Sequence, residues 1–220
     1  MRARGLWMEH VRLQAMLTAE RRELLEFLRT LAPEDWLVPS LCEGWLVRDV
    51  VAHLLWDEIS VPHYLRVAAT HRNPDRVNQH LVDEARALSV TELLARFESV
   101  VTAGGWLSRI APGGMLADLV VHHQDIRRPL QRPRTVDPRR LRHALDQPNP
   151  FGRPQRYRHG LAFIATDAAW TRGTGPAVRG TAEALALASV GRGAVLDELE
   201  GDGVDELAAR IRRTLNHARG

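Results

Sequence analysis

The chain contains the stretch Met115-Leu-Ala-Asp-Leu-Val-Val-His-His-Gln-Asp-Ile126, in which Asp118 and His122 are four positions apart. Each residue of an α-helix advances by about 100°, so His122 lies about 40° and Asp125 about 20° from Asp118, on one face. His123 points about 140° away, which favours His122 as the partner of Asp118. Such a polar stripe has two explanations. It is a solvent-facing surface or, if it faces the interior of a helical bundle, a metal site that pairs these groups.

An isolated histidine, His53, lies far upstream in Trp45-Leu-Val-Arg-Asp-Val-Val-Ala-His-Leu-Leu55. A histidine in a largely apolar helix is usually a hydrogen-bonded core residue, and that interpretation stays open. The alternative is a third ligand from a second helix. Three protein ligands leave a coordination position open, as catalytic metal sites do. Asp49 and Asp57, four residues before and after His53, are candidate partners for its second ring nitrogen.

Apolar residues at helical spacing predict four helices in residues 1–132, at about 8–30, 45–69, 89–104 and 115–128. Pro62 is expected to kink or split the second helix. Residues 71–80, which contain Asn73-Pro74, are expected to form a polar loop. Ser89 and Glu92 form a capping-box signal for the third helix. Helices joined by connections of modest length indicate a bundle.

The remainder of the chain changes character. Residues 133–155 are rich in proline and arginine and predict a connection with one short helix at 138–145. Residues 156–220 are expected to form a small α/β domain, with strands at 160–167, 170–175 and 177–180 and helices at 181–190 and 203–217. The predicted fold class is therefore α+β, mainly α: a four-helix bundle followed by a small C-terminal α/β domain.

Composition argues against several classes of protein. No apolar run approaches the ~20 residues that span a bilayer, so no membrane partner is expected. The first ten residues lack a signal-peptide core, which predicts a cytoplasmic protein. The 30 basic residues are all arginine and are scattered, except in 127–134 and 153–158. They lack interleaved aromatic residues, which argues against a nucleic-acid partner despite a pI of about 9.9. The single cysteine, Cys42, has no histidine neighbour in sequence and is expected to be a packed or surface thiol.

Two blocks carry a resemblance to a known family. Asp35-Trp-Leu-Val-Pro-Ser-Leu-Cys-Glu-Gly-Trp-Leu-Val-Arg-Asp-Val-Val-Ala-His-Leu54 resembles the N-terminal signature of the mycothiol-dependent maleylpyruvate isomerase family, within the DinB-like superfamily of metal-binding four-helix bundles. Asp118-Leu-Val-Val-His-His-Gln-Asp125 resembles that family's carboxylate-xxx-His-xx-Asp segment. Segments 165–170, 175–180 and 188–192 are similar to its C-terminal domain, so the resemblance spans nearly the whole chain.

The resemblance implies roles for five residues. His53, Asp118 and His122 would bind a divalent metal, with zinc expected and nickel, iron or manganese as alternatives. Asp125 would be an acidic catalytic residue. Arg192 would be a catalytic arginine that reaches the site from the C-terminal domain.

The resemblance also implies a cosubstrate, a low-molecular-weight thiol of the mycothiol kind. Its thiolate would add to an activated cis double bond of a small electrophile; rotation and elimination give isomerisation, and stopping after addition gives S-transfer. The implied partners are this thiol and the electrophile, bound by a monomer or homodimer. Asp118 stands where the family often has the longer glutamate, and Leu46 where a Thr or Ser would cap the helix. A metal-dependent hydrolase and a non-catalytic metal-binding bundle remain alternatives.

Overall fold

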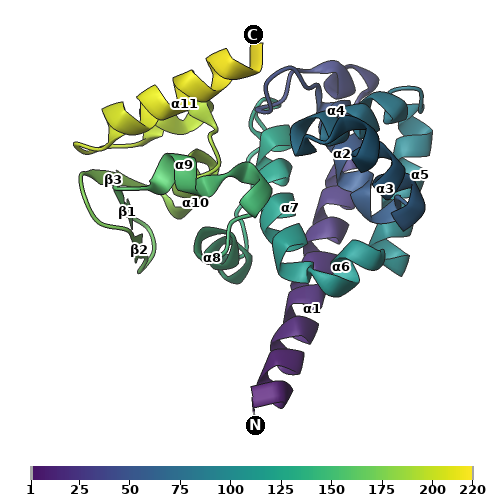
Figure 1. Cartoon of the computed structure of the whole chain (residues 1–220), viewed down its shortest axis with the longest axis horizontal. Coiled ribbons are helices and arrows are strands. Elements are labelled where there is room, and N and C mark those ends of the chain that lie inside the picture. Colours follow the sequence, from purple (N-terminus) through teal and green to yellow (C-terminus); the bar gives the residue numbers. More distant parts are fainter. Residues whose placement is uncertain (1, 220) are drawn as a thin grey trace. The chain divides into compact units, whose positions relative to one another are not determined.

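The computed structural model describes residues 2–219, without the side chains of residues 2–3, 102–103 and 215–219. The chain divides into two units, Met1–Pro133 and Arg134–Gly220. The predicted fold class is confirmed: the chain is mainly helical and carries a small three-stranded sheet in its second unit (Figure 1). Within the described part of the chain, no helix is both long enough and apolar enough to cross a membrane.

The first unit is built from helices and two short 3-10 turns. Their bounds are α1 Arg2–Leu28, η1 Pro33–Leu37, α2 Val47–His53, η2 Leu54–Glu58, α3 Val61–His71, α4 Pro74–Ala85, α5 Val90–Ala103, α6 Trp106–Ile110 and α7 Pro112–Arg127. Helix α1 packs against α5 and α7, and α2 packs against α4, α5 and α7 (Figure 1). Buried Leu24, Val50, Phe97 and Leu116 contribute one apolar side chain each from α1, α2, α5 and α7. These four helices form the predicted bundle.

The helix boundaries follow the local signals in most places. The expected break at Pro62 is confirmed: α2 and η2 end before it, and α3 starts at Val61 with the Ser60 hydroxyl accepting the His63 N–H. The capping box of α5 is also present, since Ser89 and Glu92 each accept the other's backbone N–H.

The predicted loop over residues 71–80 is wrong, because α4 begins at Pro74. The Asn73 side chain accepts the Asp75 N–H at 2.8 Å, and Pro74 occupies the first turn, where its missing N–H costs nothing. Val77 and Leu81 are then buried in an apolar cluster with Val67 of α3. Asparagine followed by proline therefore marks the start of a helix here.

The second unit contains α8 Pro138–Asp146, η3 Pro150–Gly152, α9 Pro154–Arg158, β1 Ala162–Ala165, β2 Thr171–Arg172, β3 Ala177–Gly180, α10 Ala182–Ala188, η4 Gly193–Glu198 and α11 Val204–Arg219. The strand order is β2-β1-β3, with β1 antiparallel to β2 and parallel to β3 (Figure 1). Phe163 of β1 lies opposite Val178 of β3, and both side chains are fully buried. Helix α10 packs against β1, β3 and α8.

Candidate metal centre

Three side chains from two helices converge in the first unit. His53 ends α2, and Asp118 and His122 lie one turn apart on α7. His53 Nε2 is 3.3 Å from Asp118 Oδ2, and His122 Nε2 is 3.5 Å from Asp118 Oδ1. Two ligands of a tetrahedral zinc ion, each about 2.0–2.1 Å from the metal, are separated by about 3.3–3.4 Å. The spacing of these donors therefore fits a divalent ion, and the short Asp118 side chain reaches both imidazoles.

The His53 ring is fixed by an amide from α4. Its Nδ1 is 2.7 Å from Asn78 Oδ1, which also accepts the Trp56 indole N–H at 3.3 Å. An amide oxygen only accepts hydrogen bonds, so His53 Nδ1 carries a proton, and Nε2 is the nitrogen that faces Asp118. This is the arrangement that a metal-binding histidine needs.

The two aspartates expected to hold His53 have other partners. Both oxygens of Asp49 accept from Arg86, at 3.0 and 3.1 Å. Asp57 binds Arg21 at 2.8 Å. The expectation that either carboxylate supports the His53 ring is therefore wrong, because the support comes from α4, in the segment expected to be a loop.

On the other side of the cluster, Asp125 lies fully buried behind His122. Its Oδ2 is 2.9 Å from His122 Nδ1, so it accepts the Nδ1 proton and leaves Nε2 to face Asp118. The same oxygen accepts from the Cys42 thiol at 3.1 Å, and Cys42 Sγ is 3.6 Å from His122 Nδ1. Cys42 has no histidine neighbour in sequence, but the fold places its partly buried thiol beside His122.

His123 lies outside the cluster, as the helical angle predicts. Its ring is fully buried, with Nδ1 2.8 Å from Glu20 Oε1, and its Nε2 accepts from Arg127 Nε at 2.9 Å. Both nitrogens are thus engaged on the α1 side of α7. This arrangement gives His123 a role in packing α7 against α1.

Charge is shared between Asp118 and His122. Burial opposes charge on both groups, but each stabilises the charge on the other. The Asp118 carboxylate holds the pKa of His122 well above its usual value. The neighbouring His122, with a hydrogen bond from His53, holds the pKa of Asp118 well below its usual value. A metal ion that binds at His122 Nε2 would take the place of a proton on that nitrogen.

Asn78 offers a test of how firmly His53 must be held. We expect Asn78→Leu to weaken zinc binding by roughly 10–100-fold, the usual cost of losing the hydrogen-bond partner of a metal ligand. Competition with a chromophoric chelator measures the affinity. Arg76→Ala, which changes an exposed residue of the same helix, is the matched control and should leave the zinc affinity unaltered. Equal affinity in Asn78→Leu and the control would show that Asn78 does not support the ligand.

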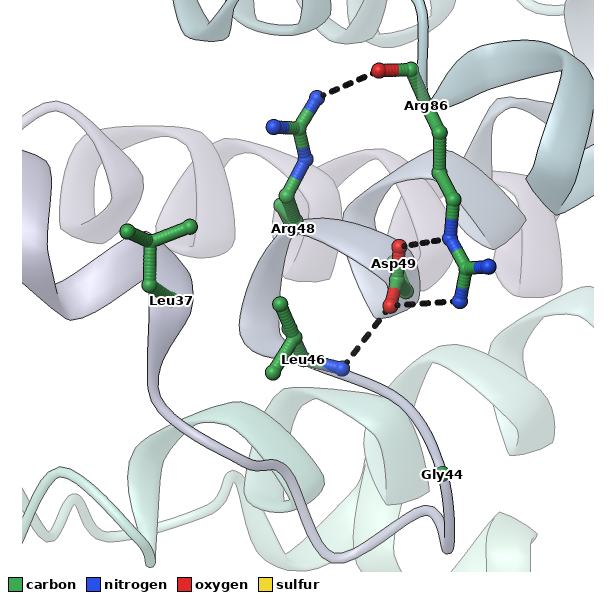
Figure 2. Close-up of a pocket in the computed structure, with 6 residues that line it drawn as sticks. All are labelled: Leu37, Gly44, Leu46, Arg48, Asp49 and Arg86. Atoms are coloured by element: carbon green, nitrogen blue, oxygen red, sulfur yellow. Dashed lines mark hydrogen bonds and ion pairs between the residues drawn. The ribbon is translucent and has the colours of Figure 1, made fainter.

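A hollow of about 370 Å³ opens near the start of α2, and none of the cluster residues lines it (Figure 2). It is lined by Leu37, Gly44, Leu46, Arg48, Asp49 and Arg86. Its charged groups hold the fold together. Arg48 donates to the carbonyl oxygens of Arg86 and Leu88, and Asp49 accepts from Arg86 and from the Leu46 N–H (Figure 2). Asp49 thus accepts the N–H of the N-cap residue, which is the half of a capping box that does not depend on the Leu46 side chain.

Comparison with known proteins supports the resemblance. Residues 17–104 match the model of the mycothiol maleylpyruvate isomerase N-terminal domain. This part of the chain belongs to that family. The match includes Cys42, His53 and Asn78 and ends before Asp118 and His122 on α7. A search among curated proteins finds no match.

Two solved structures share the fold of the chain. A crystal structure of the mycothiol-dependent maleylpyruvate isomerase has a TM-score of 0.58 at 14% identity, covering 89% of this chain and 92% of that one. A second crystal structure, of a mutant of that enzyme with a histidine replaced by alanine, has a TM-score of 0.57 at 12% identity, with the same coverage. At such identities the likeness establishes the fold alone.

The predicted site residues fall into two groups. His53, Asp118, His122 and Asp125 come together in the first unit. The roles of the first three as metal ligands and of Asp125 as an acidic catalytic residue stay predictions. Arg192 belongs to the second unit, directly before η4, where its Nη1 donates to the Val190 carbonyl at 3.2 Å. Its role in catalysis also stays a prediction.

Proposed function

We propose that this protein is a metal-dependent enzyme that uses a low-molecular-weight thiol, such as mycothiol, for isomerisation or S-transfer on small electrophiles. The observation that carries this proposal is the convergence of His53 Nε2, Asp118 and His122 Nε2, with the second nitrogen of each histidine hydrogen-bonded. Such a set supplies three protein ligands and leaves a position for a fourth. The family match in residues 17–104 supports the thiol as that fourth ligand.

The residues around the proposed metal position have different roles. When bound, a divalent ion lowers the pKa of a coordinated thiol and supplies thiolate at neutral pH. Asp118 contributes the negative charge that holds such an ion between two neutral imidazoles. Asn78 and Asp125 orient the two rings by accepting their Nδ1 protons. Asp125 is fully buried, so we assign it the positioning of His122.

The test is turnover of maleylpyruvate by the zinc-loaded protein with and without mycothiol, followed by a panel of other electrophiles. We expect turnover only with the thiol and its loss in His53→Ala. His80→Ala, a partly exposed histidine of α4, should behave as the wild type. An isomerase regenerates the thiol, whereas a transferase consumes one thiol for each product.

Two results would contradict the proposal. Turnover that is independent of the thiol would indicate hydrolysis by metal-bound hydroxide instead. Stoichiometric zinc retained in both His53→Ala and His122→Ala would show that these histidines are not the ligands.

A further inference from the structure

A second group of potential metal ligands lies on the opposite side of the His122 ring. Cys42 Sγ, His122 Nδ1 and Asp125 Oδ2 lie within 4.8 Å of one another, with separations of 2.9 Å between Nδ1 and Oδ2, 3.1 Å between Sγ and Oδ2, and 3.6 Å between Sγ and Nδ1. In tetrahedral zinc sites, a sulfur and a nitrogen ligand are about 3.5 Å apart, from bond lengths of about 2.3 and 2.0–2.1 Å. The Sγ–Nδ1 separation matches this spacing, whereas the two shorter separations to Asp125 Oδ2 are those of hydrogen bonds and must widen when one ion binds.

The loop before α2 holds the cysteine in this place. Leu41 N–H donates to the backbone carbonyl of Asp125 at 3.1 Å, which ties the loop directly to α7. The Ser40 hydroxyl accepts the Cys42 N–H at 3.1 Å, and the Cys42 carbonyl accepts the Trp45 N–H at 3.0 Å. Gly44 takes the left-handed conformation, with φ of 76°, that closes this turn. Cys42 is thus presented to His122 and Asp125 by backbone contacts on both sides.

We propose that Cys42, His122 and Asp125 form a second metal position, selective for thiophilic divalent ions such as Cd²⁺ and Zn²⁺. Thiolate sulfur favours such ions over Mg²⁺ or Mn²⁺, which prefer oxygen ligands. Cys42 is only partly buried, which leaves an approach for the ion, while Asp125 supplies a fully buried carboxylate. When the ion binds, the thiol proton leaves for solvent.

The two positions are alternatives, because they share one imidazole. A neutral imidazole has a single lone pair for a metal: Nε2 serves the position with His53 and Asp118, and Nδ1 serves the position with Cys42 and Asp125. One ion per chain is therefore expected, in one position or the other. This inference goes beyond the proposed function, since it requires neither a thiol cosubstrate nor turnover.

The single cysteine makes a direct experiment available, since any thiolate-to-metal charge-transfer band must come from Cys42. Purified protein is titrated with Cd²⁺ alone, without thiol or substrate, and followed in the near ultraviolet. His53→Ala, which removes a ligand of the first position only, should develop the band in full with one equivalent of Cd²⁺. Cys42→Ser should show no band and still bind one Cd²⁺ at the first position.

The outcome in His53→Ala decides the proposal. Absence of the band there, in a variant with wild-type circular dichroism, overturns it. A band that appears together with dimer formation on size exclusion also overturns it, because the thiolates of two chains would then share the ion. Asp118→Ala gives the same test if His53→Ala does not fold. Failure of the proposed function remains distinguishable, since it is read from zinc-dependent turnover with mycothiol.

Discussion

His122→Ala is expected to eliminate stoichiometric metal binding and to lower thiol-dependent turnover by more than about 100-fold. Losing only the hydrogen-bond partner of a metal ligand already lowers metal affinity or activity by ~10–100-fold, and this variant loses the ligand itself. The effect should exceed that of any other single change in the cluster. His122 is the one residue common to both groups of potential ligands found in the described part of the chain. Elemental analysis of the purified variant and zinc titration measure the loss.

The change also affects stability, and this has to be separated from metal loss. Without the imidazole, the buried Asp125 carboxylate loses one of its hydrogen bonds, and a hydrogen bond to a charged group contributes about 1.5–3 kcal/mol. His53→Ala leaves that bond in place and should still lose metal from the first position. His80→Ala is the control for removing a histidine. One zinc per chain in His122→Ala, bound as tightly as in the wild type, would contradict the assignment of the centre.

The polar face of α7 was predictable because it depends on a local, regular geometry. Residues four and seven positions after Asp118 return to the same side of a helix whatever surrounds it. The same arithmetic excluded His123, and the structure places that ring against Glu20 of α1. Periodicity could not decide whether the face meets solvent or protein. That required His53, which the resemblance supplied and the packing of α2 against α7 brings into contact.

The partners of the two histidines were not predictable in the same way. Asn78 and Cys42 reach the cluster from segments that no short-range rule connects to His53 or His122. For Asn78, the sequence does contain a local signal, because Asn73-Pro74 starts α4. The same dipeptide also favours a loop, which is the structure predicted for residues 71–80. For Cys42, the contact depends on a turn bonded to the α7 backbone at Asp125. The periodicity of a sequence does not predict tertiary hydrogen bonds of this kind.

Asp57→Asn is expected to destabilise the first unit by about 3–5 kcal/mol, the usual cost of breaking a buried ion pair from one side. Asp57 and Arg21 are almost fully buried and 2.8 Å apart. Asp57 also accepts from the backbone N–H groups of Gly105 and Ser108 and from the Ser108 hydroxyl. One carboxylate therefore joins α1, η2 and α6, and the amide would leave the Arg21 guanidinium uncompensated.

The same contacts make this contribution depend on pH. Burial by itself raises the pKa of Asp57, but hydrogen bonds from Ser108 and then Arg21 outweigh it, so the pKa lies below its usual value. A carboxyl group with a lowered pKa stabilises the fold above its unfolded pKa, about 3.9, and the stabilisation fades as pH falls through the folded pKa. The difference in unfolding free energy between wild type and Asp57→Asn should therefore be constant near neutrality and shrink in acid.

Urea unfolding followed by tryptophan fluorescence measures the effect in the right unit, because every tryptophan except Trp170 lies in the first unit. The matched control is Glu98→Gln, which breaks the exposed ion pair to Arg29 at the same 2.8 Å separation. An exposed pair contributes less than about 1 kcal/mol, so this variant should unfold close to the wild type. If Asp57→Asn matched Glu98→Gln, burial would not be what gives the Arg21–Asp57 pair its strength. If instead the two differ near neutrality and converge in acid, the carboxylate charge itself joins these helices.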